Sequence, residues 1–241
     1  LNSRVNPFGA GWGNMTGGWK FAGTLATARW NNMINYKTPV MNGAQFHFQH
    51  SFGNKSDTTE GTSDADRWTA VGFNWTGSRS YIAAVVDWIA AGNSANRLTD
   101  KDTWKATVGG HYKFDRFTLY GTAQYLKNTR WIGGYSTKEF APLQHAGDLT
   151  KGFDGWAFST GVDVPAAGGT VKVSAAWGFG ENNNTTNQNK YDRVNLGLGY
   201  IYPLSRRTSL YAVGGYFWQD ADWQRKNISA HEFIAGMMHR F

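Results

Sequence analysis

The sequence predicts an all-β protein: an up-and-down antiparallel β-barrel that crosses a membrane on its strands. Three observations lead to this prediction. Apolar and polar side chains alternate with a period of two along eleven segments, the connections between the segments alternate between short and long, and the last segment ends on an aromatic residue, Phe241. Successive strand side chains point to opposite faces, so each segment has one apolar and one polar face.

The hydropathy of the chain agrees with strands better than with membrane helices. No stretch approaches the roughly 18 uninterrupted apolar residues of a membrane-spanning helix, and the mean hydropathy is −0.50. A membrane barrel needs only about 9 to 11 residues per crossing, and only every second residue faces lipid. The 30 Gly and 5 Pro, with 12 Trp, 11 Tyr and 15 Phe, suit many strands joined by turns.

The alternation defines the strands and their connections. We expect strands at residues 29–37, 44–52, 67–75, 79–88, 104–113, 117–126, 154–164, 170–178, 192–202, 208–218 and 231–241. The short connections are 38–43, 76–78, 114–116, 165–169 and 203–207; the long ones are 53–66, 89–103, 127–153, 179–191 and 219–230. This alternation predicts a meander with turns at one rim and loops at the other. A soluble sandwich with Greek-key crossovers would not sort its connections in this way.

The two faces of the strands differ in composition. In the segment 104–113, Trp104, Val108 and Tyr112 lie on one face, while Lys105 and Lys113 lie on the other. Only the segment 208–218 is ambiguous, because either face carries apolar residues. Aromatic residues gather toward strand ends on the apolar faces, where a membrane interface favours amphipathic rings; these are Trp75, Trp104, Trp156, Trp177, Tyr200 and Tyr202.

Three motifs resemble one known family. Residues 29–39 read RWNNMINYKTP and are followed by Gly43, residues 202–212 read YPLSRRTSLYA, and residues 236–241 read GMMHRF. These motifs resemble a strand, a hairpin and the carboxyl terminus of the general diffusion porins of β-proteobacteria, the neisserial type. Asn31 and Pro203 depart from the residues usual in that family, which are Asp and Ala.

The resemblance implies a barrel of sixteen strands, of which this chain carries about the last eleven. Residues 1–241 then form one barrel domain, and residues 1–28 are the remnant of the loop that constricts the pore, with five strands upstream of Leu1. The competing interpretation is a twelfth strand at residues 17–28, which would let the chain close into a barrel by itself. The poor alternation of residues 17–28 favours the first interpretation.

The resemblance also implies a function and a location. It implies an outer-membrane channel of Gram-negative bacteria through which small hydrophilic solutes diffuse passively, a homotrimer in the lipid of the outer membrane, no cofactor and no catalytic residue. It further implies that the insertion machinery reads Phe241 as an assembly signal.

The distribution of charge suggests a preference of this channel for anions. The formal net charge is +7, and no cluster of basic residues on one helix or exposed face points to nucleic acid. The basic residues Arg29, Lys105, Lys113, Lys172 and Arg193 fall on polar strand faces, and Arg4 lies in residues 1–28. If those faces line a lumen, we expect the six residues to attract anions. The alternative is that they are solvated lumen charges with little effect.

Other chemistries find little support in the residues. The chain has no Cys, which excludes a disulfide scaffold and thiolate metal sites. His47, His50, His111 and His145 have no carboxylate at ligand spacing, so we expect no metal site. A solute-specific binding channel or a barrel enzyme, with Tyr120 and Trp68 stacking on a sugar or an aromatic acid, is the alternative function. A soluble lectin-like domain is a third and weaker one.

Overall fold

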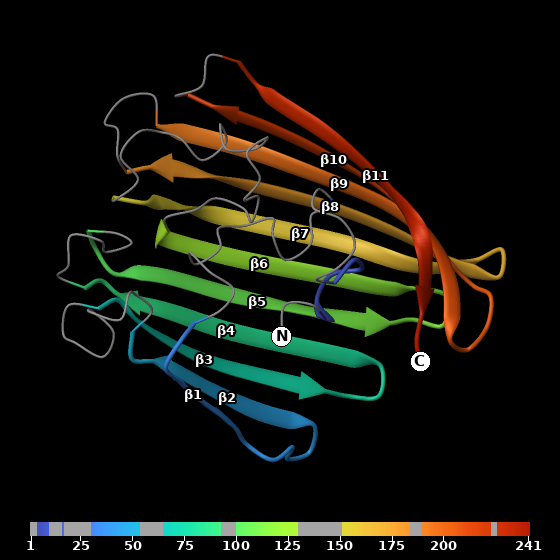
Figure 1. Ribbon diagram of the computed structural model, residues 1–241, viewed down its shortest axis with the longest axis horizontal. Helices are drawn as coiled ribbons and strands as arrows, with labels where there is room; N and C mark the ends of the chain where they lie inside the picture. Colours follow the sequence, from blue (N-terminus) through green and yellow to red (C-terminus); the bar gives the residue numbers. More distant parts are fainter. Residues whose placement is uncertain are drawn as a thin grey trace.

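A computed structural model describes residues 4–9, 16, 30–53, 65–92, 100–129, 151–183, 189–222 and 226–241. These residues form one antiparallel sheet of eleven strands, in which each strand pairs with its neighbours in sequence (Figure 1). The strands are β1 (Met33–Lys37), β2 (Ala44–Ser51), β3 (Arg67–Thr76), β4 (Ser80–Ala90), β5 (Thr103–Lys113), β6 (Thr118–Thr129), β7 (Phe153–Ala166), β8 (Gly169–Asn182), β9 (Lys190–Pro203), β10 (Thr208–Ala221) and β11 (Ile228–His239). In these ranges, no helix is long and apolar enough to cross a membrane.

The predicted meander and its eleven strands are confirmed, with differences at the strand ends. The strand expected from residue 29 begins only at Met33, because Asn32 has a positive φ of 51° and its carbonyl accepts a hydrogen bond from the amide of Phe52. Asn tolerates this left-handed conformation, which interrupts an extended strand. The strands β8 and β10 run three to four residues further toward the long connections than expected, to Asn182 and Ala221.

The short connections are tight turns at one end of the sheet. Between β7 and β8, Ala167 and Gly168 both have positive φ, 47° and 78°, as a two-residue type I′ hairpin turn requires. This turn pairs Ala166 with Gly169 and fixes the register of the whole hairpin, down to Phe153 opposite Asn182. We call this end of the sheet the turn rim and the opposite end, where the long connections begin, the loop rim.

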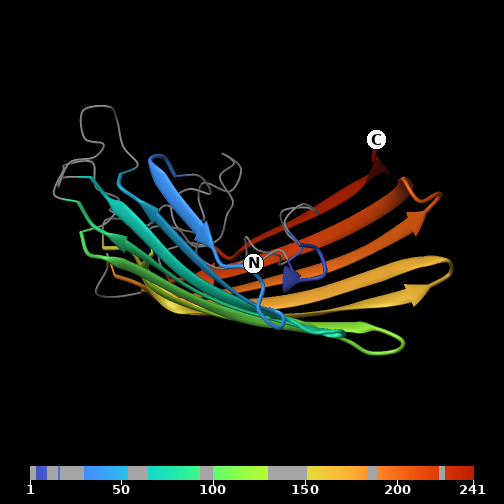
Figure 2. The ribbon, with the colours of Figure 1, turned by 90° about the horizontal axis from the view of Figure 1, so that it is seen from below.

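The sheet is strongly curved, and residues 4–9 lie on its concave side (Figure 2). In the described part of the chain the sheet is open, since β1 pairs with β2 only and β11 with β10 only. The expected twelfth strand at residues 17–28 lies outside the described residues.

The convex face carries exposed apolar side chains on every strand from β1 to β11. Val71, Val108, Val173, Leu198 and Phe233 are all exposed there. On β5, the outward rings of Trp104 and Tyr112 are eight residues apart, about 26 Å along the strand. For a strand tilted by about 35–45° this is a height of about 19–22 Å, comparable to the apolar band of about 25 Å of a membrane barrel. Five of the six residues expected in an aromatic belt are exposed: Trp104, Trp156 and Trp177 at the loop rim, and Trp75 and Tyr202 at the turn rim. The sixth, Tyr200, is half-buried, and its hydroxyl donates to carbonyls of the β7–β8 turn.

Candidate functional site on the concave face

Residues 4–9, which we call the inner segment, are held on the concave face by side chains of several strands. The carbonyl oxygen of Arg4 lies 2.9 Å from Nδ1 of His111 on β5, and the hydroxyl of Thr122 on β6 donates a hydrogen bond of 3.0 Å to the carbonyl of Val5. A carbonyl oxygen can only accept, so His111 carries a proton on Nδ1. The wall therefore binds the backbone of the inner segment at Arg4 and Val5.

The side chain of Arg4 lies over Tyr81, the first of a row of three rings on the wall. Its guanidinium carbon lies 3.9 Å from the ring centroid of Tyr81, a distance at which the ring quadrupole attracts a cation. The rings of Tyr81 and His111 are stacked with centroids 5.6 Å apart, and His111 also contacts Tyr120 at 5.4 Å. The three residues are register partners on β4, β5 and β6. Arg4 therefore has a fixed place above the wall.

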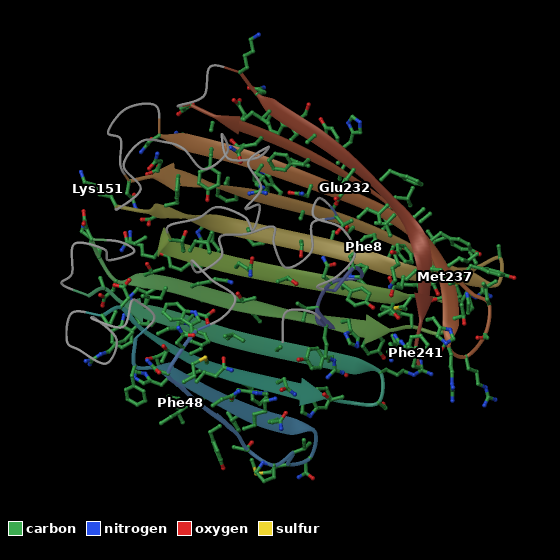
Figure 3. The ribbon with its side chains drawn as sticks, in the orientation of Figure 1. Phe8, Phe48, Lys151, Glu232, Met237 and Phe241 are labelled. Atoms are coloured by element: carbon green, nitrogen blue, oxygen red, sulfur yellow. The ribbon has the colours of Figure 1, made fainter. Side chains whose placement is uncertain are left out.

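Glycines on the concave face make room for the inner segment. Phe8 is 1% exposed, and in Figure 3 it lies over the middle of the sheet. A Cβ at Gly199 would lie 2.9 Å from Cε1 of Phe8, one at Gly197 would lie 3.0 Å from Cε2, and one at Gly161 would lie 2.4 Å from Cγ of Pro7. Real Cβ contacts are rarely this short, so these positions form a seat that side chains would fill.

Polar side chains of β7 and β8 bind the backbone of the inner segment at Pro7. The ammonium of Lys172 donates to the carbonyl of Pro7 at 2.9 Å and to the carboxylate of Asp163 at 2.7 Å. The hydroxyl of Tyr120 donates to the same carboxylate at 3.0 Å. Further along β8, the hydroxyl of Ser174 donates to the carbonyl of Thr16. Lys172, expected to attract anions, is thus paired with a carboxylate and bound to the inner segment.

The other predicted basic residues lie in different surroundings. Lys105 faces Asp87 across β4 and β5, and both side chains are buried on the concave side. Arg193 on β9 has no exposed surface, and its guanidinium lies 4.6 Å from the ring centroid of Phe217. The positions on the concave face agree with the expectation, but the carboxylate facing Lys105 and the burial of Arg193 were not expected.

The remaining predicted site residues lie at the edges of the described sheet. Lys113 is exposed at the turn rim end of β5. Phe241 follows the end of β11 and is fully exposed, with its ring centroid 4.8 Å from that of His239. Arg29 lies outside the described residues, as do most of residues 1–28.

Sequence reasoning missed the acidic partners and the seat. Asp163 and Lys172 could have been paired from the sequence, because each lies four residues from the two-residue turn at Ala167 and Gly168. No comparable signal exists for Asp87, whose long connection to Lys105 does not fix a register. The glycine seat has no sequence signal either, since it depends on where residues 4–9 lie in space.

The histidines show no sign of a metal centre. His47 Nε2 lies 2.7 Å from the side-chain oxygen of Asn74, and His50 Nδ1 lies 2.9 Å from the hydroxyl of Thr69. Within the described ranges, no three His, Asp or Glu side chains come together as metal ligands. His145 lies outside these ranges.

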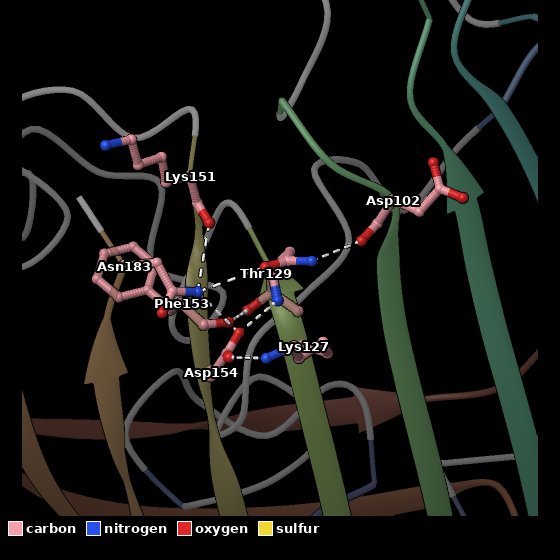
Figure 4. A network of polar contacts seen from close by, with 8 residues as sticks. Asp102, Lys127, Thr129, Lys151, Phe153, Asp154 and Asn183 are labelled. Atoms are coloured by element: carbon pink, nitrogen blue, oxygen red, sulfur yellow. Dashed lines mark hydrogen bonds and ion pairs between the residues drawn. The ribbon is translucent and has the colours of Figure 1, made fainter.

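A second polar network lies at the loop rim (Figure 4). The carboxylate of Asp154 on β7 accepts hydrogen bonds from the ammonium of Lys127, from the backbone amide of Asn128 at 2.7 Å and from the side-chain amide of Asn183 at 2.8 Å. Asn128 has a φ of 52° within an irregularity of the β6–β7 pairing, and its side chain donates to the carbonyl of Asp102. These bonds join the ends of four strands, β5 to β8, so the network stabilises the rim and leaves little of the Asp154 carboxylate for a ligand.

The chain resembles proteins of one family. Residues 2–222 match the family described as Gram-negative porin. An outer membrane porin protein of Bordetella pertussis is 28% identical over 260 residues, which cover 98% of this chain and 64% of that protein. The chain therefore spans less than two thirds of the length of this curated relative.

Solved structures show the same fold. An anion-selective porin from Comamonas acidovorans superposes with a TM-score of 0.65 at 21% identity, over 97% of this chain and 68% of that one. OmpT, an outer-membrane protein of Vibrio cholerae, superposes with a TM-score of 0.64 at 14% identity, over 96% of this chain and 72% of that one. The family match, which covers most of the chain, and the eleven-stranded meander agree. This chain belongs to the Gram-negative porin family, a family of outer-membrane proteins.

Proposed function

We propose that the protein forms a water-filled channel through which small hydrophilic solutes diffuse passively. The observation that carries the proposal is the contrast between the faces of the sheet. The convex face exposes apolar side chains along every strand, and the concave face carries polar side chains and the inner segment. Backbone groups in lipid must be paired within a closed barrel. The continuous pairing from β1 to β11 supports this for the interior of the sheet, while the outer edges of β1 and β11 have no partner strand within the described residues.

The full-length protein, reconstituted in a planar bilayer, tests this proposal. We expect discrete conductance steps that increase in proportion to salt concentration and do not saturate with small sugars. A saturable block by a micromolar solute would instead support the solute-binding alternative. No structural observation in the described ranges favours that alternative, because the Tyr120 hydroxyl is bonded to Asp163 and the Trp68 ring stacks on Trp30 at 5.6 Å.

In this proposal the inner segment belongs to the part of the chain that narrows the lumen. Its placement on the concave face, in contact with strands from β4 to β9, supports this role. Val5 and Phe8 are both buried against the wall, so their side chains fill space that water would otherwise occupy. Residues 1–3, 10–15 and 17–28 lie outside the described residues.

The channel prefers anions in our proposal, and Arg4 contributes most to this preference. The solved porin from Comamonas acidovorans is described as anion-selective, which supports the same property here. Arg4 lies over Tyr81 on the lumen side of the wall. Lys105 and Lys172, in contrast, each lie opposite a carboxylate, and an opposite charge close by reduces the field of a cation in water. Lys113 and Arg193 belong to the same proposal, as does Arg29, which lies outside the described residues.

The working unit in this proposal is a homotrimer in outer-membrane lipid. Membership of the porin family supports it, together with the exposed apolar residues Ile34 and Tyr36 on the convex face of the edge strand β1. Chemical cross-linking of the full-length protein in detergent, followed by electrophoresis, should give a ladder that ends at three subunits. A ladder that ends at one or two subunits would contradict the trimer.

A further inference from the structure

The turn rim carries most of the net positive charge of the chain. Seven exposed basic residues, which we call the basic rim, lie in the short turns or at the adjacent strand ends: Lys37, Arg79, Lys113, Arg116, Arg206, Arg207 and Arg240. Among the described residues of these turns, the only acidic side chain is Asp115, whose carboxylate pairs with the guanidinium of Arg79 at 2.7 Å. The other six basic residues have no carboxylate side chain in the turns to compensate them.

The loop rim does not share this excess. By sequence, the five long connections at residues 53–66, 89–103, 127–153, 179–191 and 219–230 contain ten Lys or Arg and eleven Asp or Glu. The formal net charge of +7 is therefore concentrated at one end of the barrel wall. Composition alone does not predict such a polarity, because solvated connections at both ends could carry either sign.

The basic rim lies directly beside exposed aromatic and apolar side chains. Arg116 lies between Phe114 and Phe117 in the β5–β6 turn, and Arg206 follows Leu204 in the β9–β10 turn; all three apolar side chains are exposed. Figure 3 shows Phe241 at this end of the molecule and Lys151 at the opposite end. Exposed rings next to cations are typical of the level of the membrane at which the headgroups lie.

We propose that the basic rim binds the phosphate groups of anionic phospholipids in the leaflet that the turns face. The inference goes beyond the channel function and rests only on the location of the protein in a membrane. An anionic lipid surface attracts nearby basic residues, and the guanidinium of Arg matches phosphate oxygens with two parallel hydrogen bonds. Continuity with the apolar belt favours lipid over a soluble anion, because a lipid would contact the rings and the cations at once.

Spin-labelled lipids measure this interaction. The full-length protein is reconstituted in phosphatidylcholine vesicles with a trace of spin-labelled phosphatidylglycerol or phosphatidylcholine, and the motionally restricted fraction of each is compared. We expect phosphatidylglycerol to associate more strongly, on the order of fivefold, at about 10 mM salt. The preference should approach one at about 1 M salt, where screening falls to about 3 Å.

Two charge-matched triple variants locate the effect. Arg116→Gln, Arg206→Gln and Arg207→Gln together should reduce the preference, whereas Lys101→Gln, Lys190→Gln and Lys226→Gln, which remove three exposed charges at the loop rim, should leave it unchanged. Arg116→Gln alone should give a smaller reduction and serves if the triple variant folds poorly. Circular dichroism and conductance steps check folding of each variant.

Several outcomes would overturn the inference. The first is equal association of the two lipids with the unmodified protein. The second is an equal loss of the preference for phosphatidylglycerol in both triple variants. The third is a loss of this preference in millimolar inorganic phosphate, which would indicate a site for soluble anions. A protein that conducts ions normally but shows no lipid preference would overturn this inference and leave the channel function intact.

Discussion

Lys172 on β8 and Asp163 on β7 form an ion pair on the concave face, with 2.7 Å between Nζ and Oδ2 and side chains that are only 13% and 17% exposed. The same ammonium donates to the carbonyl of Pro7. One cation therefore connects the wall of the sheet with the inner segment, while its charge is compensated by the neighbouring strand. We therefore propose that Lys172 positions the segment more than it attracts anions.

Removing the compensating charge should strengthen the anion preference. In Asp163→Asn the side-chain oxygen can still accept from Tyr120 and Lys172, but the charge of Lys172 is left uncompensated. We expect the chloride-to-potassium permeability ratio to rise by up to about fivefold, because a unit charge about 4 Å away in water is worth about 1 kcal/mol. The zero-current potential in a salt gradient measures the ratio. A shift of Asp163→Asn toward potassium would contradict the idea that Asp163 compensates the charge of Lys172. Lys172→Met, which removes the cation and leaves the carboxylate, should shift the ratio toward potassium.

Neutralising Arg4 should weaken the anion preference more than any other single change on the concave face. The guanidinium of Arg4 lies over the uncharged ring of Tyr81, whereas Lys105 and Lys172 each face a carboxylate. Arg4→Gln should therefore move the zero-current potential toward that of an unselective channel. Arg4→Lys keeps the charge and serves as the matched control, with at most a small change. Equal potentials for Arg4→Gln and the unmodified channel would place the selectivity elsewhere.

The alternation of side chains predicted the strands and the faces, because both depend only on local periodicity. Lys105, Lys172 and Arg193 lie on the concave face as expected. The start of β1 was predicted less well, because the left-handed conformation of Asn32 depends on its contact with Phe52 across the strand pair. Period-two counting does not detect a contact of this kind.

The environment of the site could not be predicted from local patterns. Whether Lys105 faces a carboxylate depends on the register between β4 and β5, which a long connection leaves open. Where Phe8 packs depends on Gly197 and Gly199, which lie far away in sequence on β9. The sequence thus predicted which basic residues lie on the concave face. Which of them lie opposite a carboxylate depends on the pairing between strands.

Filling the glycine seat should loosen the inner segment without unfolding the sheet. In Gly199→Ala the new Cβ would meet Cε1 of Phe8 at 2.9 Å and Cγ2 of Val213 at 3.2 Å, both of them side-chain atoms. We expect trypsin to cleave the folded protein after Arg4 faster, by up to about tenfold if the contact costs about 1.4 kcal/mol, and the open-channel current to fluctuate more.

A matched substitution separates the seat from a general effect of glycine. An added Cβ at Gly121 on β6 would meet nothing within 4 Å. Gly121→Ala should therefore leave both cleavage and current noise unchanged, and in a strand it gains stability of about 0.5–1 kcal/mol. Identical behaviour of the two variants would show that Phe8 does not need the space at Gly199.

A charge on the convex face should destabilise the barrel more than the same charge on the concave face. Phe48 and Gln49 are neighbours on β2, with the Phe48 ring exposed on the convex side (Figure 3) and Gln49 half-buried on the concave side. Phe48→Arg should lower the free energy of unfolding by about 2–4 kcal/mol near the middle of the bilayer, whereas Gln49→Arg should have little effect. Urea titration in lipid vesicles measures the free energy of unfolding of both variants. An equal decrease in the two variants would mean that the faces are assigned wrongly. Ser174 is unsuitable as the concave control, since its hydroxyl is buried and bonded to Thr16.

Deleting Phe241 should reduce insertion into the outer membrane while leaving the last strand pair formed. The hydrogen bonds that close this pair involve other residues, because His239 Nδ1 lies 2.8 Å from the hydroxyl of Thr208 and the amide of Arg240 donates to the carbonyl of Arg207. The ring of Phe241 is fully exposed and contacts the ring of His239, so its removal costs the fold little.

A loss of folded protein in the outer-membrane fraction, at unchanged total synthesis, would therefore report recognition of Phe241 by the insertion machinery. Phe241→Trp, which keeps an aromatic end, should insert normally. Unaltered insertion of the deletion variant would reduce Phe241 to an ordinary terminal residue.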